Sequence, residues 1–496
     1  MKTLIASLLF ILTPLQAAEQ SATLANEDLY QQNCAACHGA DRLGLVGPAL
    51  LPENLKRLRK KAAIETVTNG RPSTQMPPFD EKLSGEQIKA LVSHIYTPLM
   101  DIPDWGESEI EKSYISYTPL TALPTEPQHY ADPLNLFFVV EAGDHHATIL
   151  DGDKLEPIHR FKTRFALHGG AKYSPDGRFV YFASRDGWVT LFDLHSMQMV
   201  AEIRAGINTR NIAVSSDGNT VAVGNYLPHN LVLLNANDLS LKSVIQVASG
   251  GESSRVSAVY DATPRNSFIL ALKDLPEVWE IPFPTDAQPE PVIRKIMLQE
   301  TLDDFFFDQQ YKHLIGSSRK GQGQVIDLDL GRKIADISLE GMPHLGSGIS
   351  WRRGNQTVMA SPNLRKSALT IIDVNNWKTI EEIKTKGPGF FMRSHENSRY
   401  AWADVFFGPN RDLVHIIDKQ SLEIVKTVRP APGKTAAHIE FTRDGRYALL
   451  SIWEEDGALI VYDGDTLEEI KRIPMKKPVG KYNVFNKITK SEGTSH

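Results

Sequence analysis

Residues 174–193 read SPDGRFVYFASRDGWVTLFD, a turn followed by two short strands. Ser174-Pro175-Asp176-Gly177 has the composition of a tight turn, and the aromatic and β-branched residues from Phe179 to Tyr181 favour an extended chain. Gly187 then opens a second strand, Trp188 to Asp193. The stretch is therefore predicted to be two consecutive strands entered through a tight turn.

This unit recurs along the rest of the chain at a nearly constant spacing. The strand that follows the turn is predicted to begin near residues 137, 179, 221, 268, 313, 358, 400 and 447. The steps are 42 to 47 residues, the length of one four-stranded propeller blade. Eight starts predict an all-β eight-bladed propeller over residues 134–496. A β-sandwich is the alternative, but it does not require a fixed period of this size.

A short motif near the other end of the chain has a different character: Cys34-Ala35-Ala36-Cys37-His38. Its spacing lets both thiols bond to one haem while the histidine binds the iron. The chain has only 2 cysteines, and both are here. A disulfide would not need the histidine, and a zinc site would need a second ligand pair that the sequence does not have. Cys34 and Cys37 are therefore predicted to hold one covalent haem c, with His38 on its iron.

The surrounding residues, 24–100, are predicted to form a small all-α cytochrome c domain. Ser84 and Gln87 have the spacing of a capping box at the start of its last helix. Met76 lies on a proline-rich loop before that helix and is predicted to be the second iron ligand, which raises the reduction potential. A methionine filling a core gap is the alternative. His94, on the last helix, is the rival ligand, although we expect it to face solvent.

Residues 1–17 are predicted to be a secretory signal peptide. Lys2 precedes an apolar run, Leu4–Leu12, and Leu15-Gln16-Ala17 offers a small-residue cleavage site. The apolar run is too short to cross a bilayer comfortably, although a retained anchor is the alternative. Export also suits a covalent haem. We therefore expect a periplasmic protein that does not span the membrane.

Composition is that of a soluble globular protein and gives no support for nucleic-acid binding. Hydrophobic residues make up 41% and charged residues 23%, as in soluble globular proteins. The net charge of −6 gives no sign of the basic surface that nucleic-acid binding requires.

Residues 101–133 are rich in proline, threonine and tyrosine with no sustained period. This segment is predicted to be a linker, or an arm lying on the propeller.

The propeller itself implies no activity, so function must come from the loops around its axis. Arg185, Arg210 and Arg255 each lie beside a predicted blade turn. Repeated arginines of this kind suit a ligand with several carboxylates, because guanidinium pairs with carboxylate through two hydrogen bonds. Ion pairs at strand ends are the alternative explanation.

The order of a CxxCH domain and an eight-bladed propeller resembles the cytochrome cd1 nitrite reductase family and its paralogues. The resemblance spans nearly the whole chain after the signal. It is sharpest at the following motifs: Phe165-Ala166-Leu167-His168, Arg185-Asp186-Gly187, Arg255-Val256-Ser257-Ala258-Val259, Ser451-Ile452-Trp453 and Gly480-Lys481-Tyr482-Asn483-Val484. The family fold implies a noncovalent haem d1 in the propeller, with His168 as proximal iron ligand and Arg185 and Arg210 beside the carboxylates.

One departure changes the expected reaction. The reductases place two histidines over the iron, and His344 matches one, but the other falls near Thr301-Leu302-Asp303-Asp304, where there is no histidine. The pattern is closer to the paralogous dihydro-haem d1 dehydrogenases, which desaturate a propionate to an acrylate. That resemblance implies a catalytic pair, His438 and Tyr482, with His344 beside them. The structural alternative is that His438 and Tyr482 only line the pocket.

Three readings follow. In the first, the protein oxidises dihydro-haem d1 to haem d1, the last step of haem d1 synthesis for denitrification, and passes electrons to its haem c. The second is an NO-forming nitrite reductase, which the missing histidine disfavours. The third is a haem d1 carrier without turnover, which would not need a haem c. The first reading implies three partners: dihydro-haem d1, a periplasmic electron acceptor, and the cytochrome cd1 nitrite reductase that receives the product.

Overall fold

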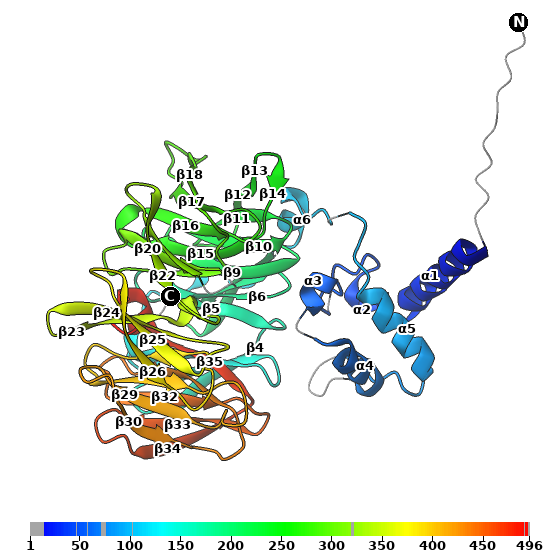
Figure 1. The fold of residues 1–496 in the computed structure, drawn as a ribbon. Coiled ribbons are helices and arrows are strands. Elements are labelled where there is room, and N and C mark those ends of the chain that lie inside the picture. Colours follow the sequence, from blue (N-terminus) through cyan, green and yellow to red (C-terminus); the bar gives the residue numbers. More distant parts are fainter. Residues whose placement is uncertain are drawn as a thin grey trace, which may run out of the picture. The chain divides into compact units, whose positions relative to one another are not determined.

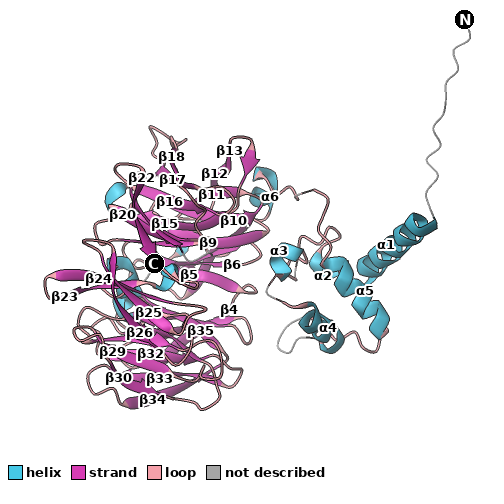
Figure 2. Ribbon diagram, in the orientation of Figure 1, coloured by secondary structure: helices cyan, strands magenta, loops and turns pink. Residues whose placement is uncertain are grey.

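The computed structural model describes residues 14–45, 47–56, 58–70, 76–101, 103–318, 322–490 and 492–494. Residues 1–13 of the predicted signal peptide lie outside this part, and residues 14–17 belong to the first described helix. The chain divides into two compact units, residues 1–103 and 104–496. Figure 2 shows that helices dominate the first unit and strands the second. No helix in the described ranges is long and apolar enough to cross a membrane.

The first unit is helical, as predicted. Its helices are α1 (Pro14–Asn33), α2 (Ala35–His38), α3 (Pro52–Leu55), α4 (Lys60–Asn69) and α5 (Gly85–Ile95). Helix α5 begins at a capping box. The Ser84 hydroxyl accepts from the Gln87 backbone nitrogen at 3.2 Å, and the Gln87 side-chain oxygen accepts from the Ser84 backbone nitrogen at 2.9 Å. One face of α5 is buried and packs with Tyr30 of α1 in the core of this unit.

The second unit is an eight-bladed propeller, so the predicted fold class is confirmed. Figure 1 shows its sheets following one another along the colour gradient from cyan to red. Blades one to four comprise, in order, β35 (Pro478–Asn483), β2 (Leu136–Glu141), β3 (His146–Asp151), β4 (Glu156–Lys162); β5 (Leu167–Tyr173), β6 (Phe179–Ser184), β7 (Trp188–Asp193), β8 (Gln198–Arg204); β9 (Asn208–Val214), β10 (Thr220–Leu227), β11 (Asn230–Asn235), β12 (Leu241–Gln246); β15 (Val256–Ala262), β16 (Ser267–Leu272), β17 (Glu277–Pro282), β18 (Arg294–Met297).

Blades five to eight comprise, in order, β19 (Asp304–Phe307), β20 (His313–Ser317), β21 (Gln322–Asp327), β22 (Arg332–Ser338); β23 (Ile349–Arg353), β24 (Gln356–Pro362), β25 (Ala368–Asp373), β26 (Lys378–Lys384); β27 (Met392–Arg393), β28 (Tyr400–Asp404), β29 (Val414–Asp418), β30 (Ile424–Val428); β31 (Ala436–Phe441), β32 (Tyr447–Ile452), β33 (Gly457–Asp463), β34 (Glu469–Met475). A small hairpin, β13 (Ala248–Ser249) with β14 (Glu252–Ser253), follows the third blade. The predicted strand starts fall within two residues of the second strand of each blade.

The ring is closed by the C-terminal strand. Strand β35 pairs antiparallel with β2, with Asn483 opposite Phe137 and Tyr482 opposite Phe138. The end of the chain therefore supplies the innermost strand to a blade that begins at residue 136. This pairing leaves no open edge between the first and last blades.

Residues 104–133 lie on the propeller as an arm. Helix α6 (Glu107–Lys112) buries Ile110 in the core between two blades, and β1 (Ile115–Ser116) adds a fifth strand beside β8. The Trp105 indole nitrogen donates to the Arg204 carbonyl oxygen at 2.9 Å. Two short 3-10 turns, η1 (Leu120–Ala122) and η2 (Pro133–Asn135), complete the segment.

Candidate functional site

The CxxCH motif occupies α2 and the turn before it. Cys34 and Cys37 are free thiols rather than a disulfide. The His38 ring is buried and its Nδ1 lies 2.8 Å from the Pro48 carbonyl oxygen, which leaves Nε2 to bind an iron. Burial lowers the pKa of His38 although the Pro48 contact opposes it, so the ring stays neutral, as a metal ligand must. A Cβ at Gly47 would lie 2.7 Å from His38 Cε1, so this ring needs a glycine beside it.

Of the two candidate second ligands, Met76 packs, partly buried, on the same apolar cluster as Cys34 of the motif. The expectation that His94 faces solvent was wrong, because its side chain is only 11% exposed. Its Nε2 lies 3.2 Å from a Glu27 carboxylate oxygen, and its ring is 5.5 Å from that of Tyr30. His94 is thus tied to α1 by these contacts.

In the propeller, His438 lies on a bulge of the innermost strand β31. The register shifts between Ala437 and Ile439, and His438 has a φ of +55°. Bulges redirect side chains and are common beside active sites. The ring is buried and lies 5.3 Å from that of Tyr482 and 4.8 Å from that of Phe391. Burial, together with the charge of Lys481, lowers the pKa of His438 well below its usual value, so its imidazole is neutral at neutral pH.

Tyr482 occupies a space that two glycines leave open. A Cβ at Gly480 would lie 2.7 Å from the Tyr482 hydroxyl oxygen, and one at Gly170 would lie 3.2 Å from its Cε1. The Tyr173 hydroxyl donates to the Tyr482 carbonyl oxygen at 2.7 Å and fixes the strand below the ring. Burial raises the pKa of Tyr482 to about 12, so its hydroxyl keeps its proton at neutral pH.

His344 joins the same group through two phenylalanines. Its Nδ1 lies 2.8 Å from the Phe390 carbonyl oxygen, and its ring is 4.2 Å from that of Phe390 and 6.1 Å from that of Phe391. Phe391 also contacts His438. The structure therefore brings the three predicted catalytic side chains together around one aromatic wall, Phe390 and Phe391. His344 and His438 contact this wall, and Tyr482 contacts His438.

Asp404 supports this wall and was not predicted from the sequence. It lies at the end of β28, buried, and one oxygen accepts from the backbone nitrogens of Phe390 (2.7 Å) and Phe391 (3.1 Å). The other oxygen accepts from the His438 nitrogen at 3.4 Å. Burial raises the pKa of Asp404 to about 7 even though these backbone hydrogen bonds favour the carboxylate. One carboxyl group thus connects the segments that carry both histidines.

The three predicted arginines fall into two arrangements. Arg210 pairs with Asp304 at 3.4 Å, and Tyr260 donates to the same carboxylate at 2.9 Å. Arg185 and Arg255 both lie over the ring of Tyr226, at 5.9 and 5.6 Å. Arg255 also pairs with Asp274 at 2.5 Å. All three are therefore in blades two to four, on neighbouring segments.

Tyr226 and Asp304 were missed as functional candidates. Neither occurs in a catalytic motif, although Asp304 belongs to the Thr301–Asp304 stretch singled out for its missing histidine. His168, the predicted proximal ligand, begins a bulge in β5 between His168 and Lys172. Its side chain lies outside the described part of the structure.

An eight-bladed propeller that brings together a buried histidine, a partly buried tyrosine and clustered arginines, joined to a helical CxxCH unit, defines a cytochrome whose second prosthetic site is in the propeller. Residues 131–487 match the family model described as Cytochrome D1 heme domain. Residues 22–95 match the model for cytochrome C oxidase, cbb3-type, subunit III.

The relatives agree with this class along nearly the whole chain. The dihydro-heme d1 dehydrogenase of Pseudomonas aeruginosa is 56% identical over 485 residues, which cover 97% of this chain and 98% of the relative. The nitrite reductase of Stutzerimonas stutzeri is 25% identical over 531 residues, 93% and 92% of the two chains. A solved dihydro-heme d1 dehydrogenase, NirN in complex with DHE, has 57% identity and a TM-score of 0.91, covering 93% of this chain and 99% of that one. The chain belongs to the cytochrome d1 haem domain family and, within it, to the dihydro-haem d1 dehydrogenases.

Proposed function

We propose that this protein oxidises dihydro-haem d1 to haem d1 by desaturating a propionate side chain to an acrylate. The observation that carries the proposal is the gathering of His344, His438 and Tyr482 around one aromatic wall. The membership of the dehydrogenase family, predicted from the sequence and confirmed by the relatives, supports it. The reaction completes haem d1 synthesis for denitrification.

The proton chemistry follows from the protonation states of the pair. Forming the double bond removes two electrons and two protons from the substrate. His438 is neutral and can accept a proton, whereas Tyr482 retains its own and can donate or relay one. We therefore assign His438 as the base and Tyr482 as its proton-passing partner, with His344 beside them.

The helical unit would take up the electrons. Cys34 and Cys37 would hold a single covalent haem c, and His38 and Met76 would bind its iron. That group supplies an acceptor for one electron at a time. The free thiols, the orientation of the His38 ring and the position of Met76 on the same core support this assignment.

The substrate is a polycarboxylate that contains iron, and the propeller offers groups for both features. Arg185, Arg210 and Arg255 would pair with its carboxylates, and His168 would bind its iron from the proximal side. Nitrite reduction is disfavoured because the resemblance puts the second distal histidine of the reductases near Thr301–Asp304, where this chain has no histidine. Two residues of this stretch are already engaged, Asp303 by Lys273 and Asp304 by Arg210.

The location and the remaining partners follow from the reaction. The predicted haem c attachment and the predicted signal peptide support a periplasmic location, where a soluble electron acceptor would reoxidise the haem c. The cytochrome cd1 nitrite reductase is the expected recipient of the product. A carrier without turnover would share the arginines and His168 but would gain nothing from His438 and Tyr482.

An anaerobic conversion assay tests the proposal. Dihydro-haem d1 is added to the protein with an oxidant, and its spectrum is followed in a single turnover. Tyr482→Phe should slow the conversion by about 10²–10⁴-fold, the usual contribution of proton transfer, while substrate affinity stays nearly unchanged. Binding without conversion in the wild type would leave the carrier function instead. An unchanged rate in Tyr482→Phe would reduce this residue to a pocket wall.

A further inference from the structure

A cavity opens at the ends of the innermost strands that lie away from the catalytic candidates. Its volume is about 600 Å³, and it is lined by the C-terminal residues of β5, β9, β15 and β19, by α7 (Val484–Thr489) and by the segment that follows α7. The His438 bulge and Arg210 lie nearer the beginnings of their strands and do not line it. The cavity is therefore separate from the group of catalytic candidates.

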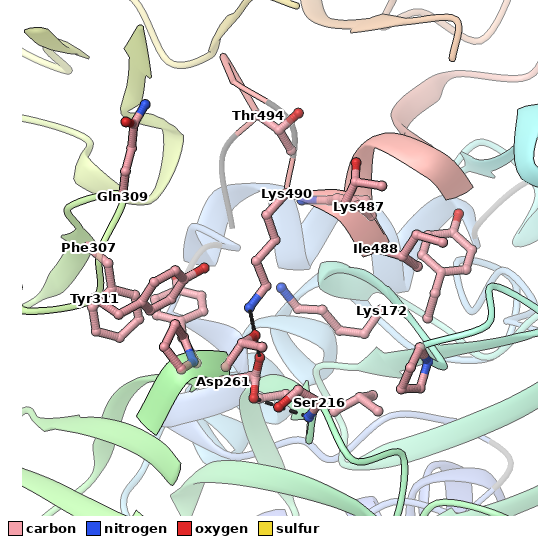
Figure 3. A pocket seen from close by; sticks show the side chains of 18 of the residues that line it. Lys172, Ser216, Asp261, Phe307, Gln309, Tyr311, Lys487, Ile488, Lys490 and Thr494 are labelled. Carbon is pink, nitrogen blue, oxygen red and sulfur yellow. Dashed lines mark hydrogen bonds and ion pairs between the residues drawn. The ribbon is translucent and has the colours of Figure 1, made fainter. Parts of the chain in front are cut away.

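Three lysines line this cavity: Lys172 from β5, Lys487 from α7 and Lys490 just after α7. Figure 3 shows the ammonium ends of Lys172 and Lys490 extending toward one another. Their closeness is reflected in the pKa of Lys172, which burial, and then the charge of Lys490, lower to about 8. Two like charges that converge in an enclosed space repel one another unless an anion lies between them.

Asp261 and Asp304 favour the charged form of Lys172, but they do not offset its burial and the charge of Lys490, so its pKa stays lowered. Asp261 pairs with Lys490 at 2.7 Å. Asp308 accepts from the ring of His313 at 2.7 Å, and Glu492 accepts from the Arg352 nitrogen at 3.0 Å.

The Lys172 ammonium has no hydrogen bond or ion pair with the residues that the structure describes. It only lies 5.5 Å from the centre of the Tyr260 ring. A half-buried ammonium of this kind is costly unless a ligand supplies the missing charge.

We propose that this cavity is a binding site for a small oxyanion of the phosphate or carboxylate type, held between Lys172 and Lys490. The lining is suited to such a ligand, because Tyr311, Gln309 and Thr489 add polar groups to the wall of the cavity. The cavity is large enough to admit a phosphate or a dicarboxylate with water. The site is independent of the dehydrogenase reaction proposed above.

The site also has a physical connection to the substrate-binding arginines. The Tyr260 ring faces Lys172, and its hydroxyl donates to Asp304, which pairs with Arg210. An anion that repositions Lys172 would therefore act on a residue only two contacts away from Arg210.

Calorimetric titration of the full-length protein with inorganic phosphate tests the site, with succinate as a second titrant and chloride at equal ionic strength as the control. Phosphate or succinate should bind and raise the melting temperature, whereas chloride should not. The titrant that binds more tightly identifies the type of oxyanion. Equal effects of all three salts would overturn the proposal.

Variants separate a built site from general charge effects. Lys172→Met should weaken binding on the order of 10- to 100-fold, as expected for loss of a hydrogen bond from a charged group, while Lys172→Arg should largely retain it. Lys384→Met, on the exposed outer strand β26, is the matched control and should bind like the wild type. If Lys172→Met fails to fold, Lys490→Met serves instead, because it leaves Asp261 without its cation and should also abolish binding. Wild-type affinity in a folded Lys172→Met or Lys490→Met variant would contradict the assignment.

Discussion

At the scale of single residues, Asp404 is the residue on which the geometry of both histidines depends. It fixes His438 directly through the backbone and reaches His344 through the Phe390 peptide, whose carbonyl contacts the His344 ring. Asp404→Asn keeps the shape but replaces one acceptor oxygen with a donor NH₂ group. We expect slower desaturation with substrate affinity nearly unchanged, measured by single-turnover rate and by titration. Asp286→Asn, on an exposed loop, is the control, and equal rates in the two variants would contradict a positioning role.

The same variant has a distinct pH signature. Folded Asp404 holds its proton up to a pKa of about 7, whereas the ordinary value is 3.8. Between these values the native state binds the extra proton, so the contribution of Asp404 to stability falls as pH rises. Asparagine does not ionise. The melting temperature of Asp404→Asn relative to the wild type should therefore increase from about pH 4 to about pH 7, and a constant difference would show that the pKa is not raised.

Met76, as the proposed second ligand, is expected to set the potential of the proposed haem c. A thioether ligand raises the reduction potential relative to other ligands. Met76→Ala should lower the midpoint potential and remove the sulfur-to-iron absorption band, both measurable in the intact protein. His94→Ala is the matched test, since its contacts with Glu27 and Tyr30 predict an unchanged band. The opposite pattern would make His94 the ligand.

The residues that could be predicted from the sequence are those whose role depends on neighbouring positions. The haem motif lies within five consecutive positions, so its meaning does not depend on the fold. Asp404 acts on backbone groups 13 to 34 positions away, and no motif around it has a catalytic spacing. His344, His438 and Tyr482 were named through a family resemblance, and the structure adds the aromatic wall that brings them together.

At the scale of elements, turn residues made the second strand of each blade predictable, because Asp-Gly and similar turns precede it directly. The innermost strands carry the site but were not predicted, since their bulges break the alternation of side chains, as at His438. The closure by β35 joins the two ends of the propeller segment and leaves no local signal. The extended arm over blade two, residues 104–133, also depends on contacts distant in sequence, such as that between Trp105 and Arg204.

Strand β35 offers a test of how an element positions Tyr482, a proposed catalytic side chain. Gly480 has no positive φ, so alanine suits its backbone, but the new Cβ would lie 2.7 Å from the Tyr482 hydroxyl oxygen. Gly480→Ala should fold, displace the Tyr482 ring and slow desaturation toward the rate of Tyr482→Phe. Gly85→Ala is the control, because a Cβ there meets nothing within 4 Å. A wild-type rate in Gly480→Ala would show that the position of the hydroxyl does not matter.

At the scale of the whole molecule, the proposed reaction needs both units. Desaturation in the propeller yields two electrons, and the haem c of the helical unit would accept them one at a time. Each unit has its own core, so removing the haem attachment should leave the propeller folded. The double variant Cys34→Ser with Cys37→Ser should therefore bind dihydro-haem d1 with wild-type affinity but oxidise it far more slowly than the wild type when both are given the same oxidant. Circular dichroism would check the fold, and anaerobic spectra would follow substrate and product. Conversion by the double variant at the wild-type rate would mean that the electrons leave the substrate by a route that does not use the CxxCH unit.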